Sequence, residues 1–168
     1  MSTHSSRAEF YQLWLMLRRV MHQMSNIRSK ELSRYGLSMA EAGAMAVIYS
    51  LDGKATPAEV ARQTLREPHT VSGLLTRMYR KGLVNKTPDQ GQKNIVRVSL
   101  TDKGFEVYWK AMEVESVGEI LSVLNEQERK QFWTALRKLR QKSTEYQTKS
   151  NEVSIRGRLS LGSSTGSR

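Results

Sequence analysis

Cysteine is absent from this chain of 168 residues, and its histidines are His4, His22 and His69. The absence of thiols excludes disulfides, thiolate nucleophiles, cysteine-based redox sensing and zinc ribbons. The three histidines fit no metal-binding spacing, so we expect neither a metal site nor a cofactor.

The sequence also lacks a long hydrophobic run. Its longest nearly apolar stretch, residues 40–51, is interrupted by Glu41 and Ser50. A membrane-spanning helix needs roughly 20 apolar residues, and residues 1–9 hold no apolar core of a signal peptide. We therefore expect a cytoplasmic protein that does not bind membranes.

Acidic residues are scarce relative to basic ones. The chain has 27 Lys and Arg against 16 Asp and Glu, a net charge of +11. Such an excess is typical of proteins that bind a polyanion, most often nucleic acid, with an anionic membrane surface as the other common partner. Residues 66–82 hold four basic residues and one acidic residue, whereas residues 105–148 hold seven of each. The middle of the chain is therefore the expected binding region.

Apolar periodicity and capping signals predict a series of helices. Residues 7–36 repeat apolar side chains at a period near 3.5, which favours a long helix that pairs with another helix. Capping boxes begin at Ser38 and Thr56, and Pro68 suits the first position of a further helix. That helix, residues 68–81, has one apolar face, formed by Val71, Leu74, Leu75 and Met78.

After Gly82 the periodicity changes from 3.6 to 2. Residues 83–87 and 95–100 alternate as two strands around a polar loop at residues 88–94. Thr101 caps a helix that we expect to continue to Leu124, and Asn125 caps a last helix. From about residue 148 the chain is rich in Ser, Gly and Arg, which predicts a disordered tail.

Two short helices, a tight turn and a β-hairpin predict a winged helix-turn-helix. We expect a mainly α-helical fold with a small β-hairpin wing, framed by long terminal helices that dimerise. The expected regions are 1–36 for the N-terminal dimerisation helix, 37–104 for the DNA-binding domain, 105–148 for the C-terminal dimerisation helices and 149–168 for the tail.

The exposed face of the helix at residues 68–81 is expected to read DNA in the major groove. It combines small hydrogen-bonding side chains with basic side chains and has no acidic residue, whereas a merely solvated helix usually mixes Glu and Lys. The expected DNA contacts are Arg66, His69, Thr70, Ser72, Gly73, Thr76 and Arg77, with Arg97 in the second strand.

Together these motifs resemble the MarR family of bacterial regulators over about residues 8–145. The resemblance is carried by Glu59-Val60-Ala61, by Thr70-Val71-Ser72 with Leu74, Leu75 and Arg77, by Gly82-Leu83-Val84, and by the wing from Pro88-Asp89 to Val98-Ser99-Leu100-Thr101-Asp102-Lys103-Gly104. It implies a dimeric repressor that binds a pseudo-palindromic operator in double-stranded DNA. It also implies that a small aromatic effector releases the DNA, as in many members.

This sequence departs from the family pattern at three places. Thr64-Leu65 stands where the family often has Leu-Gly, and Gly73 where it often has Arg. At the wing tip, Gln92-Lys93-Asn94 replaces the usual Asp-Arg-Arg. The resemblance therefore implies that Lys93 takes the place of the minor-groove arginine, without the aspartate that orients it, and that the wing binds less tightly.

The outer helices hold every Trp and Phe of the chain. Core packing is the ordinary role of such residues, but the period near 3.5 favours pairing between two copies. The expected dimer contacts are Phe10, Leu13, Leu17, Phe132, Trp133 and Leu136. Weaker candidates for an effector pocket, chosen by residue type, are Trp14, His22, Tyr35, Met45, Tyr49 and Trp109.

Three other classes of protein fit the sequence less well. An enzyme is disfavoured because residues 52–56 lack the spacing of a phosphate-binding loop. No Ser-His-Asp arrangement can be proposed either, because His69 lies on the helix expected to read DNA. A membrane-surface protein would need a basic amphipathic helix. A winged helix that binds only proteins would need an apolar exposed face at residues 68–81, and it stays as the alternative to a DNA-binding transcription regulator.

Overall fold

The structure is a computed structural model of the chain that describes residues 2–89, 91, 95–113 and 115–162, with side chains between residues 6 and 149. Two compact units, Met1–Gly118 and Glu119–Arg168, are described separately. The helices are α1 (Ser2–Ser33), α2 (Met39–Ser50), α3 (Pro57–Thr64), α4 (Pro68–Arg80), α5 (Asp102–Met112), α6 (Glu115–Ser122) and α7 (Glu126–Gly162). The strands are β1 (Val84–Pro88) and β2 (Val96–Leu100).

The predicted capping boxes of the short helices are confirmed. The Ser38 hydroxyl accepts a hydrogen bond from the Glu41 backbone N–H at 3.2 Å, and the Glu41 carboxylate accepts one from the Ser38 N–H at 2.9 Å. Thr56 and Glu59 form the same pair of bonds at the start of α3, at 3.2 and 2.7 Å. These boxes fix where α2 and α3 begin because they satisfy backbone donors that a helix leaves unpaired.

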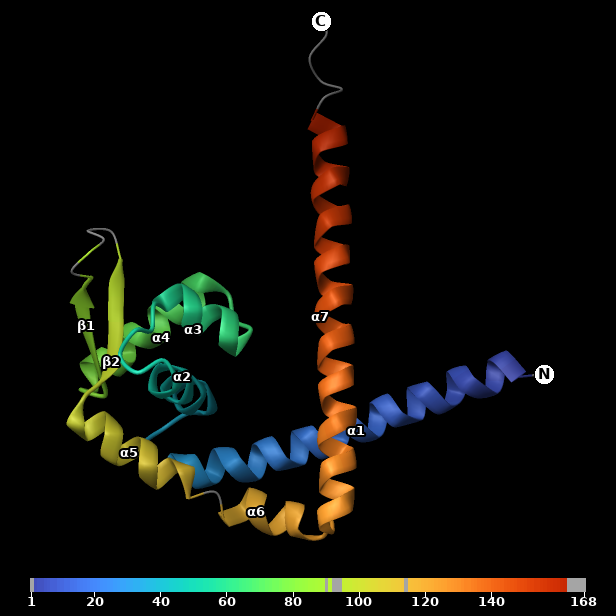
Figure 1. Cartoon of the computed structure of the whole chain (residues 1–168), viewed down its shortest axis with the longest axis horizontal. Helices are drawn as coiled ribbons and strands as arrows, with labels where there is room; N and C mark the ends of the chain where they lie inside the picture. The colour runs from blue at the N-terminus through green and yellow to red at the C-terminus, as the bar shows by residue number, and fades with distance from the viewer. Residues whose placement is uncertain (1, 90, 92–94, 114, 163–168) are drawn as a thin grey trace, which may run out of the picture. The chain divides into compact units, whose positions relative to one another are not determined.

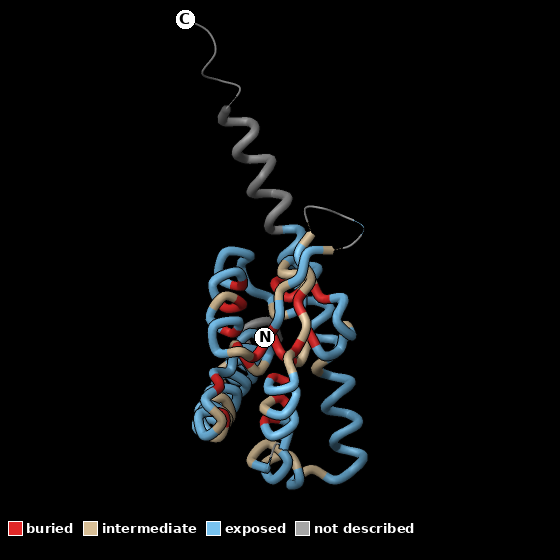
Figure 2. Tube along the Cα trace, turned by 90° about the vertical axis from the view of Figure 1, so that its left-hand side faces the viewer, coloured by how far each residue is buried: buried red, intermediate tan, exposed pale blue. Residues whose placement is uncertain are grey.

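The hydrophobic core of the first unit is centred on the winged helix and also includes Leu32 of α1 and Tyr108 and Ala111 of α5. Among the described residues, the buried apolar side chains all fall between Leu32 and Ala111, and the described side chains outside this range are mostly exposed (Figure 2). Helices α2, α3 and α4 lie together beside the hairpin (Figure 1). The predicted apolar face of α4 is confirmed, since each of its four residues is at most 2% exposed: Val71, Leu74, Leu75 and Met78.

The hairpin is antiparallel, with Val84 opposite Leu100 and Pro88 opposite Val96. A further backbone bond, from the Val98 N–H to the Ala55 carbonyl at 2.8 Å, joins β2 to the chain just before α3. At the other end, Gly104 packs so closely that a Cβ there would lie 2.1 Å from the Leu83 carbonyl oxygen. Only glycine fits this approach, which explains one residue of the wing motif.

An ion pair links the end of α1 to the junction of α5 and α6. Arg28 donates to the Glu31 carboxylate at 2.6 Å and, through its other terminal nitrogen, to the carbonyl of Ala111. The Ser116 hydroxyl donates to the same carboxylate at 2.9 Å. The bond from Arg28, followed by those from Ser116, outweighs the effect of burial and holds the pKa of the Glu31 carboxyl below its usual range.

The prediction of one continuous helix from Thr101 to Leu124 is wrong, because two helices, α5 and α6, cover this range. The cap at Thr101 is confirmed by a 2.9 Å bond from the Gly104 N–H, but α5 ends at Met112, where Glu113 leaves the helical region. No Gly or Pro marks this break. It coincides with the Arg28 bond to Ala111 O, a tertiary contact that the local sequence does not reveal.

Helix α7 begins at the predicted cap, where Asn125 and Glu128 bond reciprocally at 2.9 and 2.8 Å. It continues through Gly162, so residues 149–162 are helical where a disordered tail is predicted. Those residues contain no proline and, before Gly162, a single glycine, so little opposes the helix. Residues 163–168 lie outside the described residues. No helix among the described residues has the length and apolar character to cross a membrane.

Candidate nucleic-acid interface

Helix α4 presents its polar face to solvent, as the sequence predicts. His69, Thr70, Ser72, Gly73 and Arg77 are all exposed along one side of the helix, opposite its buried side. Small hydroxyls and a guanidinium at these positions are able to donate to base edges and phosphates.

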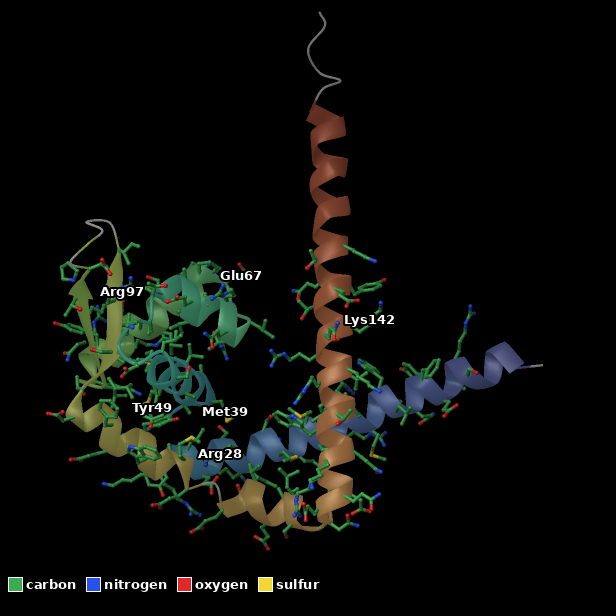
Figure 3. All side chains as sticks on the ribbon, in the orientation of Figure 1. Arg28, Met39, Tyr49, Glu67, Arg97 and Lys142 are labelled. Atoms are coloured by element: carbon green, nitrogen blue, oxygen red, sulfur yellow. The ribbon has the colours of Figure 1, made fainter. Side chains whose placement is uncertain are left out.

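The start of α4 is open, because its N-cap residue Glu67 makes no side-chain capping bond (Figure 3). The exposed Arg66 precedes it, and Leu65 adopts a left-handed conformation with φ of 54°. Leu65 thus makes the turn between α3 and α4, where the family that the sequence resembles often has glycine. At Gly73, a Cβ would meet only the flexible end of Arg77 at 3.6 Å, so glycine is not required there for space.

Thr76 is less available for contact with DNA than the sequence suggests. It is half-buried, its hydroxyl donates to the Ser72 carbonyl at 2.9 Å, and it accepts from Lys86 Nζ at 3.1 Å. Lys86 on β1 therefore reaches the exposed face of α4 and joins the interface. Sequence reasoning missed it, although the two-residue alternation from buried Val84 places Lys86 on the same side of β1.

Arg97 is tied to internal partners near the loop end of the hairpin. Its Nε donates to Asp89 at 2.5 Å, and its Nη1 donates to the Lys54 carbonyl at 2.6 Å. Figure 3 shows Arg97 on the hairpin. These bonds join β2 to the end of β1 and to the turn before α3. Lys93 and Gln92, at the predicted wing tip, lie outside the described residues.

The C-terminal end of α4 is clamped by a buried carboxylate. Glu41 is 4% exposed, and its carboxylate pairs with Lys81 at 2.8 Å. Lys81 Nζ also donates to the Gly36 carbonyl at 3.0 Å, and Lys103 Nζ donates to the Lys81 carbonyl at 2.9 Å. Burial alone would raise the pKa of the Glu41 carboxyl, but the bonds from Lys81 and Ser38 outweigh it and hold that pKa below its usual range.

Four aromatic rings gather between α2 and α5. The Tyr49 ring lies 4.9 Å from that of Tyr108, 5.4 Å from that of Trp109 and 6.2 Å from that of Phe105. Figure 3 labels Tyr49 on α2. A surface hollow of about 480 Å³ adjoins them, lined by Ile48, Tyr49, Ser50, Asp52, Gly53, Ser99, Leu100 and Phe105. Sequence reasoning missed Phe105 and Tyr108, whose apolar spacing on α5 was the available signal. Burial, followed by the nearby Tyr49, raises the pKa of Tyr108.

The other effector candidates do not join this cluster. Met45 is 0% exposed in the core and is not among the residues that line this hollow. Tyr35 is half-buried against the core. Trp14 is exposed on α1, where it stacks on Tyr11 at 5.7 Å, and the exposed His22 bonds to Asn26.

The predicted dimer residues are available on the surface of the single chain. Phe10, Leu13 and Leu17 on α1 are 66%, 60% and 39% exposed, and Phe132 and Trp133 on α7 are 44% and 63% exposed. Leu136 is half-buried. Within the described residues, no group of three His, Cys, Asp or Glu side chains is placed to hold a metal ion.

Comparisons with known proteins identify the relatives of this arrangement. A family model described as the MarR family matches residues 35–93. The HTH-type transcriptional regulator PecS of Dickeya dadantii is 26% identical over 121 residues, 67% of this chain and 70% of PecS. The organohalide-sensing transcriptional regulator RdhR, in its 2,4-dichlorophenol-bound form, is 28% identical with a TM-score of 0.69, over 78% of this chain and 79% of RdhR. Residues 35–93 of this chain are thus similar to the MarR family.

Further solved MarR-family structures share the winged-helix fold. A cysteine mutant of MarR from E. coli, complexed with operator DNA, has a TM-score of 0.70 at 20% identity and covers 78% of this chain and 95% of MarR. The complex of S. aureus MepR with DNA has a TM-score of 0.67 at 22% identity, over 74% of this chain and 91% of MepR. The predicted fold class, mainly α-helical with a hairpin wing, is thereby confirmed.

Proposed function

We propose that this protein is a transcription regulator of the MarR family that binds double-stranded DNA with sequence specificity. The observation that carries the proposal is the two-sided character of α4. Its apolar side is buried in the core, while its other side presents Thr70, Ser72 and Arg77 without an acidic residue between them. A helix anchored in this way and exposed on its polar side fits the major groove.

The residues of the interface divide into two roles in this proposal. Thr70, Ser72 and Arg77 contact base edges, and Arg66, His69 and Lys86 contact phosphates around them. Gly73 brings the α4 backbone close to the groove. Arg97 supports the wing through Asp89 and Lys54 rather than reading DNA itself, because two of its nitrogens already donate to protein oxygens.

The regulator acts as a homodimer in this proposal. Support comes from the large apolar side chains of α1 and α7, which the single chain leaves exposed. Exposed apolar surface of this extent is typical of an interaction face. A two-fold dimer would present two copies of α4 about one DNA turn apart, to a pseudo-palindromic operator.

The regulator is proposed to be a repressor that a small aromatic effector releases from DNA. The 2,4-dichlorophenol-bound form of RdhR supports an effector of this class. In this chain, Tyr49 of α2 and the three rings of α5 beside it, among them Trp109, supply an aromatic surface. Ring stacking favours flat aromatic ligands.

Selection of bound sequences from random duplexes tests the proposal, because a sequence-specific dimer should recover a pseudo-palindrome. Arg77→Ala should then weaken binding by about 1–3 kcal/mol and relax the preference at one base pair of each half-site. The matched control is Lys110→Ala, which removes an exposed cation from α5 and should preserve the preference. Recovery of no common sequence would favour the protein-binding winged helix instead.

A further inference from the structure

Leu65 combines an unfavourable backbone conformation with an exposed apolar side chain. It lies in the turn between α3 and α4, with φ of 54° and ψ of 43°. It is 84% exposed, the largest fraction among the large hydrophobic residues that the structure describes. Apart from glycines, the other described residue with a positive φ is Asp52, and aspartate tolerates that conformation better than leucine does. Leu65 is therefore an outlier in both respects.

The backbone of this turn requires the left-handed conformation but not the leucine side chain. The Arg66 N–H donates to the Ala61 carbonyl at 3.0 Å, and the Leu65 N–H donates to the Arg62 carbonyl at 3.4 Å. These two bonds form a motif that ends many helices, in which glycine usually occupies the left-handed position. Glycine would adopt the same turn without strain. A strained residue whose side chain the fold leaves exposed indicates a contact outside the chain.

The turn adjoins the proposed DNA-binding side of α4. Figure 3 labels Glu67, which lies between Leu65 and the first residue of α4, Pro68. The Cα atoms of Leu65 and Pro68 are at most about 11 Å apart, because three peptide units of about 3.8 Å join them. The first residues of a recognition helix contact base edges in the major groove. Leu65 and α4 belong to one compact unit, so one duplex is able to contact both.

We infer that Leu65 is a specificity-determining residue that packs against the C5-methyl group of a thymine in the major groove. The inference rests on the proposed function and adds a base preference to it. Hydrogen-bond donors and acceptors line the major-groove edges of the bases, and the thymine methyl is the apolar group among them. A leucine side chain has no group that bonds to a phosphate, a donor or an acceptor. The methyl is therefore the feature of a base edge that complements Leu65.

Two substitutions in the full chain separate the side chain from the turn. Leu65→Gly removes the side chain and the strain together. Leu65→Asn removes the apolar character but keeps a residue that adopts a positive φ readily. Because the leucine is strained and exposed, neither variant should unfold at a lower temperature than the wild type. The matched control is Val123→Asn, which changes an apolar residue that is 80% exposed and lies outside the winged helix.

Removal of single methyl groups from the DNA tests the contact itself. Each protein is titrated, at one salt concentration, with a selected duplex and with duplexes in which one thymine is replaced by uracil. Uracil forms the same base pair but lacks the methyl group. At one position of a half-site, uracil should weaken wild-type binding about fourfold, which corresponds to about 0.8 kcal/mol for one buried carbon group.

Both Leu65 variants should bind the thymine duplex at least about fourfold more weakly than the wild type, and uracil at that position should weaken them no further. Val123→Asn should keep the wild-type ratio between thymine and uracil. Such a pattern would couple one side chain to one methyl group, which a purely structural role for Leu65 would not produce.

Three results would overturn the inference and leave the proposed function standing, provided that a common sequence is recovered. The first is equal sensitivity to uracil in the wild type and both Leu65 variants, or none at any position. The second is weaker binding of both variants to all duplexes alike, which would assign Leu65 to the sugar-phosphate backbone. The third is a lower unfolding temperature of both variants, which would assign Leu65 to the fold. A wild-type chain without sequence preference would remove the proposed function and the inference together.

Discussion

The winged helix and the outer helices differ in where they place their large apolar side chains. In the winged helix, Met45, Leu75 and Val98 are 0% exposed, whereas Phe10 on α1 and Trp133 on α7 are 66% and 63% exposed. The first region completes its own core within one chain. The second leaves apolar surface that burial would stabilise by about 25 cal/mol per Å², so we expect its stability to depend on a partner. This difference is the physical basis of the proposed dimer.

The largest expected effect, on the free energy of unfolding, comes from substituting one residue in each region by alanine. Leu75→Ala should lower the free energy of unfolding by about 2–5 kcal/mol, because it opens a cavity in a closed core. Trp133→Ala should affect folding within one chain far less but should weaken self-association. Urea unfolding at several protein concentrations, with sedimentation of the folded protein, separates the two effects.

Leu75→Ala should leave the mass of the folded species unchanged, whereas Trp133→Ala should shift it toward the monomer. If instead Trp133→Ala cost as much unfolding free energy as Leu75→Ala, at every protein concentration and without a change in mass, α7 would belong to a core within the chain. The proposed difference between the winged helix and the outer helices would then be wrong.

The winged helix was also the region that the sequence predicted best, and the reason is physical. Its signals are local: Ser38 and Glu41 lie three residues apart in one capping box, and the buried side of α4 follows helical spacing. The break at Glu113 was not predicted, and it coincides with a bond from Arg28, far away in sequence, to the carbonyl of Ala111. Local rules do not contain such a contact.

The candidate site shows the same division between local and distant signals. Exposure of Thr70, Ser72 and Arg77 follows from their position opposite the buried side of α4, so helical periodicity suffices. The bonds of Lys86 to Thr76 and of Arg97 to Lys54 join residues from different elements. Their partners, and hence the supporting role proposed for Arg97, emerge only when the hairpin is placed against the helices.

An intermediate effect is expected from the buried charge that distinguishes the winged helix from α7. Glu41→Gln keeps the size of the side chain but removes its ionic bond to Lys81. It should lower the free energy of unfolding by about 1–2 kcal/mol near neutral pH. Lys130→Gln, in an exposed pair on α7, should change it by less than about 0.5 kcal/mol.

The pH dependence of this loss has a defined sign. The folded pKa of Glu41 is lowered below an unfolded value of about 4.3. Its charge therefore stabilises the fold fully above that value, and the contribution is lost as pH falls through the folded pKa. The difference between wild type and Glu41→Gln should shrink on the acid side of about pH 4 in unfolding titrations. A difference that grew on acidification would contradict the assigned ion pair.

The smallest expected effect concerns the wing and sharpens its contrast with α4. Lys93 stands between β1 and β2 where the family carries an arginine, and a lysine ammonium lacks the planar fork of a guanidinium. Its contact should therefore be mainly electrostatic. Lys93→Ala should weaken binding to selected and scrambled duplexes alike and lower the salt slope by about one unit. Lys93→Arg should tighten binding, because arginine suits a narrow minor groove.

Affinity against salt concentration for the three proteins measures both effects. A changed sequence preference in Lys93→Ala, with the wild-type salt slope retained, would mean that the wing reads bases and shares the role assigned to α4.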